Sequence, residues 1–68
     1  DEGDGQLLVA MEKLGERERK IVSLKYFAGM SNKEIAEMLE LTATNVGVVL
    51  YRSLDKLKKL LEADKYIR

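Results

Sequence analysis

The C-terminal third of the chain is the feature that most constrains its fold. From Thr44 to about Lys65 the sequence follows an uninterrupted helical pattern, and the chain contains no proline. At about 100° per residue, the apolar positions of this stretch fall within a narrow arc. The arc contains Val46, Leu50, Ser53, Leu57 and Leu61, flanked by Leu54 and Leu60. One side of a long C-terminal helix must therefore pack on the rest of the protein.

Three shorter stretches with helical spacing precede this one, over residues 7–14, 16–28 and 31–40. Few residues are aromatic, whereas Leu, Lys, Glu and Ala are common, a composition typical of helical proteins. We therefore predict an all-α fold, a small four-helix domain with a three-helix core and an added N-terminal helix. This domain is expected to cover residues 6–68, after a disordered acidic end at residues 1–5.

The boundaries between these helices carry recognisable signals. Gly29 is well placed as the left-handed residue that ends the second helix. Ser31 and Glu34 have the spacing of a capping box, in which each side chain binds the other residue's free backbone N–H. A brief connection follows at Glu40–Thr42, and Thr42 or Thr44 can cap the last helix.

The shorter helices are also expected to contribute to the core. In the second stretch, the expected core or core-edge residues are Ile21, Leu24, Tyr26, Phe27 and Ala28. In the third stretch, the apolar side is expected to consist of Ile35, Ala36, Met38 and Leu39.

Length and composition exclude several classes of function. A chain of 68 residues buries only about 60% of its unfolded surface, too little for a deep enzyme pocket. The absence of Cys and His removes the commonest metal ligands, and no apolar run reaches the ~20 residues of a membrane span. No enzyme activity, cofactor, metal, membrane contact or small-molecule substrate is expected. A cytoplasmic location is the default.

The third and fourth stretches together have the form of a helix-turn-helix. The first of these helices has the small Ala36 at its centre, and the second begins with Val46 directed to the core. This arrangement leaves the amino-terminal end of the second helix projecting, in a shape that fits the major groove of DNA.

The stretch LGERERKIVSLKYFAGMSNKEIAEMLELTATNVGVVLYRSLDKLKKLL resembles region 4, the promoter-binding region at the C-terminus of bacterial RNA polymerase sigma factors. Within that family it is most similar to the extracytoplasmic-function (ECF) branch, and the resemblance covers roughly residues 7 to 61. The resemblance implies a domain that reads the −35 element of promoter DNA and docks on the flap of the polymerase β subunit. It also implies that an anti-sigma factor can cover the domain.

The resemblance further implies which residues contact DNA. Lys25 stands where the family often has an arginine on a phosphate, and Asn32 and Lys33 begin the helix that lies across the DNA backbone. The positions that open and continue the recognition helix are Thr44, Asn45, Gly47, Val48, Val49, Tyr51, Arg52 and Lys56.

Val48 and Val49 depart from the family pattern, in which position 49 is commonly arginine and position 47 or 48 is often basic or polar. Val48 lies about 180° and Arg52 about 140° from the core arc, whereas Val49 lies at the margin nearest the core. In one interpretation the valines pack on thymine methyl groups while Asn45 offers its amide to adenine. In the other, the valines and Tyr51 form an apolar patch for a protein partner. The basic side chains that remain favour the first.

Two alternative functions stay open. The stretch GMSNKEIAEML fits the DNA-binding domain of a LuxR-type response regulator equally well, although LKYF and LYRSLDKLKKLL fit the sigma pattern better. The apolar surface around Val48 and Tyr51 would also suit a helix-turn-helix that has become a protein-interaction module and no longer reads DNA.

Overall fold

The computed structural model describes the backbone of residues 2–67 and the side chains of residues 5–63. Within this part of the chain it contains no strand and four helices: α1 (Glu2–Glu12), α2 (Glu16–Tyr26), α3 (Asn32–Leu39) and α4 (Ala43–Ile67). The prediction of an all-α, four-helix fold is confirmed. The predicted boundary between a disordered end and the domain stays a prediction, since residue 1 and the side chains of residues 1–4 lie outside the described part.

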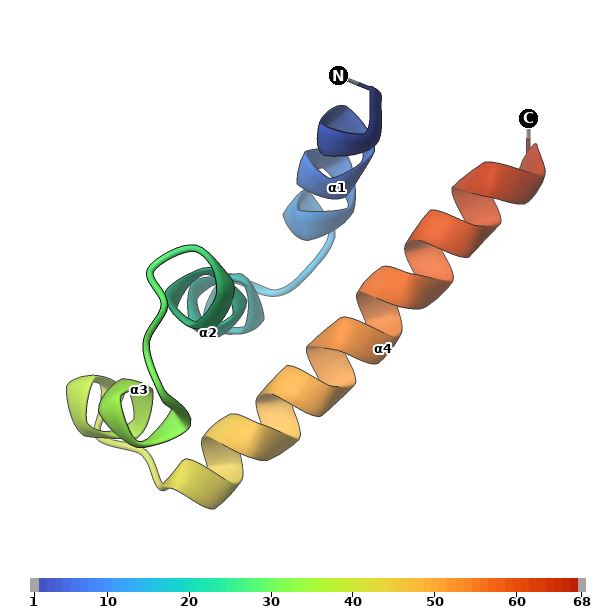
Figure 1. The fold of residues 1–68 in the computed structure, drawn as a ribbon. Coiled ribbons are helices and arrows are strands. Elements are labelled where there is room, and N and C mark those ends of the chain that lie inside the picture. The colour runs from blue at the N-terminus through green and yellow to red at the C-terminus, as the bar shows by residue number, and fades with distance from the viewer. Residues whose placement is uncertain (1, 68) are drawn as a thin grey trace.

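The longest helix, α4, forms one side of the molecule over its whole length. Figure 1 shows α3, α2 and α1 following one another along α4, from its N-terminal end towards its C-terminal end. Each of the three packs on α4, and α2 also packs on α3. The resulting domain is elongated, with extents of 41 × 21 × 16 Å. One helix therefore holds the other three in place.

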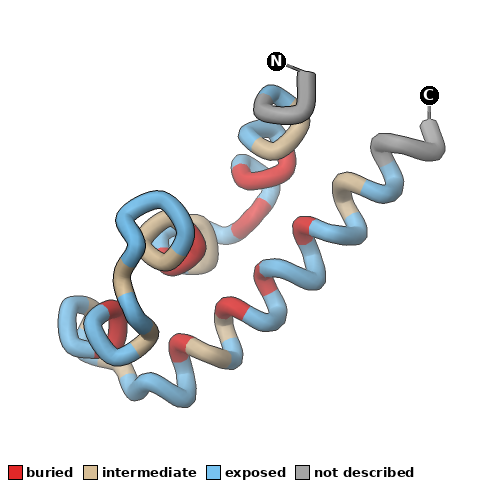
Figure 2. Tube along the Cα trace, viewed as in Figure 1, coloured by how far each residue is buried: buried red, intermediate tan, exposed pale blue. Residues whose placement is uncertain are grey.

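The core lies between α4 and the other helices, on the side of α4 that faces them (Figure 2). The fully buried side chains are Ile21, Ile35, Val46 and Ser53. The predicted apolar arc of α4 is confirmed further along the helix, where Leu50 and Leu57 are buried and Leu61 is partly buried against the core.

Four residues expected in the core or at its edge are exposed instead: Tyr26, Phe27, Ala28 and Met38. The expectation extended the helical spacing of the second stretch to position 28, but α2 ends at Tyr26, so Ala28 leaves the core side. Tyr26 and Phe27 lie about 90° and 170° from the mean direction of Ile21 and Val22, which places them away from the core. Val22, which is buried, completes the apolar side of α2. On α3, Met38 lies about 110° from the mean direction of Ile35 and Ala36, which places it on the solvent side.

The connection from α2 to α3 follows the sequence signals. Gly29 has φ +72°, a left-handed conformation that glycine adopts without steric cost, and the N–H of Met30 donates to the Leu24 carbonyl at 3.0 Å. The capping box is confirmed. The Ser31 N–H donates to Glu34 Oε1 at 2.8 Å, and the Glu34 N–H donates to Ser31 Oγ at 3.1 Å.

The connection from α3 to α4 is as short as predicted. Glu40 adopts a left-handed conformation with φ 57°, and the N–H of Leu41 donates to the Ala36 carbonyl at 2.8 Å. Thr42, and not the threonine two residues later, caps α4, because its Oγ1 accepts a hydrogen bond from the Asn45 N–H at 3.0 Å. This tight turn sets the angle at which α4 leaves α3.

Candidate nucleic-acid interface

The first turns of α4 present one exposed face away from the core. Val48 is 41% exposed and Tyr51 is 76% exposed. Thr44, Asn45 and Arg52 are exposed as well. We call these five residues the outward face. Because the buried arc lies on the opposite side of the same helix, a partner can contact the outward face without any change in the core.

Gly47 and Val49 lie at the two margins of the outward face. A Cβ atom added at Gly47 would lie 3.8 Å from Asn32 Nδ2, so this margin faces the start of α3. Val49 is partly buried and packs against the core on the other margin, as the helical wheel predicted. Of the two valines, therefore, Val48 is the one directed outward.

The remaining predicted contacts at the ends of α2 and α3 differ in exposure. Lys33 is exposed, whereas Asn32 and Lys25 are half-buried. Asn32 Oδ1 is buried and has no hydrogen-bond partner among the described residues. Since Asn32 opens α3 and lies beside Gly47, the first turn of α3 and the second turn of α4 meet at one place.

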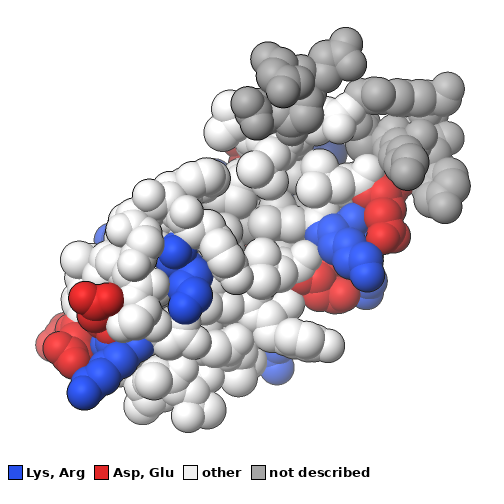
Figure 3. Space-filling model, in the orientation of Figure 1, with Lys and Arg blue, Asp and Glu red and all other residues white. Residues whose placement is uncertain are grey.

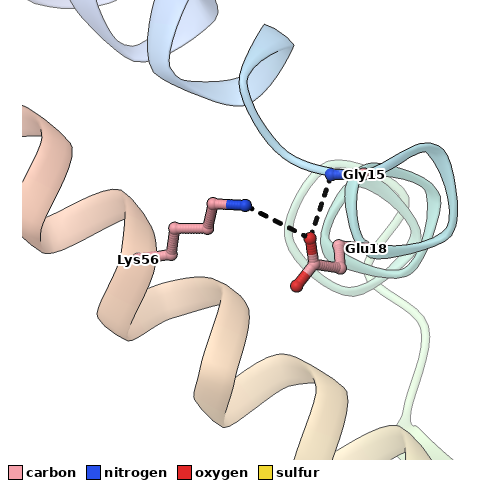
Figure 4. A network of polar contacts seen from close by, with 3 residues as sticks. All are labelled: Gly15, Glu18 and Lys56. Atoms are coloured by element: carbon pink, nitrogen blue, oxygen red, sulfur yellow. Dashed lines mark hydrogen bonds and ion pairs between the residues drawn. The ribbon is translucent and has the colours of Figure 1, made fainter.

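Lys56, predicted to lie along the exposed side of α4, is directed towards α2. Figure 4 shows its side chain reaching from α4 to Glu18, and the Nζ atom lies 3.9 Å from Glu18 Oε1. The same carboxylate oxygen accepts a hydrogen bond from the Gly15 N–H at 2.9 Å. The Gly-x-x-Glu spacing gives a local signal for that hydrogen bond, but the contact with Lys56 joins positions 38 residues apart in the sequence.

Asp55 adds a negative charge that the sequence interpretation did not consider. It follows Val48 by seven residues, or about two helical turns, and so lies on the same side of α4. Lys59 Nζ lies 3.1 Å from Asp55 Oδ2, in an i,i+4 pair whose spacing is visible in the sequence. Because a carboxylate repels a phosphate, this side of α4 is less suited to DNA at Asp55 itself than over its first turns.

Charged side chains are unevenly distributed on the face shown in Figure 3. Acidic and basic groups gather together over α3 and over the C-terminal half of α4, while most of the surface between them is uncharged. Long-range attraction to a polyanion is therefore modest on this face.

Two shallow grooves lie beside the helices. The first, between the start of α2 and the α3–α4 turn, is lined by Glu16, Arg17, Lys20, Leu39 and Leu41. The second, between α1 and the C-terminal half of α4, is lined by Leu7, Leu54, Leu57, Lys58, Leu61 and Glu62. The described side chains include no group of three acidic residues that could hold a metal ion. No described helix is both long and apolar enough to cross a membrane.

Comparison with protein-family models matches residues 4–57 to the family described as sigma-70, region 4. Comparisons with curated proteins and with solved structures gave no match. The matched range covers most of the chain and includes α2, α3, the turn and the whole outward face of α4. The sigma-factor resemblance is thus supported over the LuxR-type alternative. The chain belongs to the sigma-70 region 4 family, the DNA-binding domains of transcription initiation factors.

Proposed function

We propose that this domain reads the −35 element of bacterial promoters, in the cytoplasm, as region 4 of an ECF-type sigma factor. The observation that supports this most is the outward face of α4, which projects from a helix-turn-helix and has the buried arc directly behind it. A helix held in this way can enter the major groove while the rest of the domain stays on the DNA backbone.

The outward face offers three kinds of DNA contact. The amide of Asn45, in the first turn, can bind the N6 and N7 edge of an adenine, and a good bidentate contact of this kind is worth about 1–3 kcal/mol. Val48 can pack on a thymine methyl group. Arg52, for which no carboxylate lies within ion-pair distance among the described side chains, is suited to a phosphate. This chemistry favours A·T-rich sequence at the positions under α4.

Few basic side chains accompany this face, so binding by the isolated domain is expected to be weak. The formal net charge is zero, and both Lys56 and Lys59 are paired with carboxylates. We infer that docking on RNA polymerase supplies the missing affinity. The groove between α2 and the α3–α4 turn, which combines Leu39 and Leu41 with Arg17 and Lys20, is our candidate for the β-flap contact.

A titration followed by amide chemical shifts tests the proposal. Duplexes selected from a randomised pool are added to the labelled domain at low salt, and the peaks of residues 44–52 are expected to move. Arg52→Ala should weaken binding to every duplex, whereas Lys58→Ala removes the same charge from the α1-facing side of α4 and serves as the matched control. Unmoved peaks in 44–52 with every duplex would rule the proposal out.

A second candidate is a protein-interaction module, favoured by the exposed apolar side chains of α4. Val48, Tyr51 and Leu54 are 41%, 76% and 40% exposed. The same titration with a β-flap fragment in place of DNA separates the two functions. Shifts in 44–54 with the protein fragment, and none with DNA, would favour the interaction module.

A further inference from the structure

We propose that Glu18 lowers the DNA affinity of this domain by pairing with Lys56 when no DNA is bound. The inference rests on the proposed function, because Lys56 matters here as a phosphate contact. Glu18 lies on α2 and is not among the predicted DNA contacts. It acts on DNA through Lys56 and is therefore a positioning residue.

The geometry of the contact makes Glu18 a fixed partner for a half-exposed lysine. Glu18 Oε1 accepts the Gly15 N–H at 2.9 Å, and this hydrogen bond holds the carboxylate at the start of α2. Lys56 Nζ approaches the same oxygen to 3.9 Å. The side chains of Lys56 and Glu18 are 48% and 31% exposed, so water and a competing anion can reach the pair. Figure 4 shows the lysine side chain extended across the space between α4 and α2.

This pair is also the one ion pair among residues 5–63 that joins two helices, since Lys59 and Asp55 both belong to α4. A DNA phosphate that binds Lys56 has to draw the ammonium group away from Glu18. Because an exposed ion pair is weak, a DNA phosphate can displace the Glu18 carboxylate from Lys56. The free energy needed to break the ion pair is then subtracted from the free energy of DNA binding. The range measured for such pairs corresponds to a loss of about 1.4-fold to fivefold in affinity.

Glu18→Gln removes the negative charge but keeps the hydrogen bond with Gly15 at the start of α2. Glutamine retains a side-chain oxygen that can accept the Gly15 N–H, but it no longer attracts an ammonium group. Glu16→Gln is the matched control, because it removes the same charge two residues earlier on α2. Glu16 forms no ion pair with Lys56 in the described part of the chain.

The test is a double-mutant cycle on DNA binding. Affinity for one selected duplex is measured for the wild type, Glu18→Gln, Lys56→Met and the double variant, each across a salt series. Glu18→Gln is expected to bind about 1.4-fold to fivefold more tightly than both the wild type and Glu16→Gln. In the Lys56→Met background, Glu18→Gln is expected to change nothing, because its target is gone.

Two results would overturn the inference while leaving the proposed function intact. One is an equal gain from Glu18→Gln with and without Lys56, which would mean general repulsion between the carboxylate and DNA. The other is a gain no larger than that of Glu16→Gln. If no variant binds any duplex, the proposed function and this inference fail together. Thermal unfolding of each variant shows whether the cap is retained: Glu18→Gln is expected to lower the midpoint by no more than the loss of one exposed ion pair.

Discussion

Two small residues of α4 occupy opposite environments. Ser53 is fully buried in the core, and its hydroxyl has no hydrogen-bond partner among the described residues. Gly47 lies at the margin of the outward face, in a helix interior where glycine lowers stability relative to alanine. Both positions are therefore places where a single substitution should stabilise the domain.

We expect Ser53→Ala to raise the free energy of unfolding by about 1 kcal/mol. Burial of an unpaired hydroxyl is unfavourable, and its replacement by a methyl group removes that cost and leaves the size of the side chain almost unchanged. Urea unfolding followed by circular dichroism measures the change, and Ser23→Ala, at a half-buried position of α2, controls for the general preference of helices for alanine. A decrease for Ser53→Ala would show that the hydroxyl has a partner in solution.

Gly47→Ala and Gly29→Ala should change stability in opposite directions. The added Cβ at Gly47 meets Asn32 Nδ2 at 3.8 Å, an ordinary contact, so the gain in helix propensity of about 1 kcal/mol is retained. Gly29 has φ +72°, where alanine is strained even though no atom lies within 4 Å of the new Cβ. Thermal unfolding should give a higher midpoint for the first variant and a lower one for the second. A lower midpoint for Gly47→Ala would show that the space between Gly47 and Asn32 is too small for a Cβ atom.

At the scale of the helix, the start of α3 depends on a carboxylate. The hydrogen bond from the Ser31 backbone N–H lowers the pKa of Glu34 below its ordinary value of 4.5, and the hydrogen bond with the Ser31 side chain lowers it further, by a smaller amount. Because the folded-state pKa is the lower one, this carboxylate stabilises the fold at pH values above 4.5. The contribution is lost as the pH falls from 4.5 through the folded-state pKa.

We therefore expect the amide protons of the first turn of α3 to exchange faster as the pH falls through this window, beyond the intrinsic change of exchange rate with pH. Glu34→Gln, which cannot titrate, should show the intrinsic change alone. Hydrogen exchange of residues 31–35 in the two proteins provides the comparison. The same dependence in both proteins would assign the effect to another acid.

Most of the elements follow from local sequence signals, whereas contacts between elements do not. Gly29, the Ser31–Glu34 pair and the spacing of leucines in α4 act within a few residues, and each predicted its part of the structure correctly. The exposure of Ala28 was missed because the helical period was continued beyond the end of α2. The partner of Lys56 depends on where α2 lies against α4, which no local pattern specifies.

At the scale of the whole molecule, stability depends on α4, because each of the other three helices packs on it. A domain of 68 residues has a total stability of roughly 3–10 kcal/mol at the usual stability per residue. A substitution on the buried side of α4 can remove a large part of that total.

Leu57→Ala is expected to lower the free energy of unfolding by about 2–5 kcal/mol, since Leu57 is only 5% exposed and lies beside Leu7 of α1. Leu54→Ala, three residues earlier and 40% exposed, is the matched control and should cost much less. Urea unfolding of the two variants measures the difference. Equal losses would mean that α1 does not pack on α4 in solution as described.

The separation of α4 into a buried arc and an outward face has a practical consequence for engineering. A library that randomises Thr44, Asn45, Val48, Tyr51 and Arg52 leaves every side chain of the arc untouched. Selection from such a library could yield variants for synthetic gene circuits. Each variant would bind a different promoter sequence, and all would share the same core.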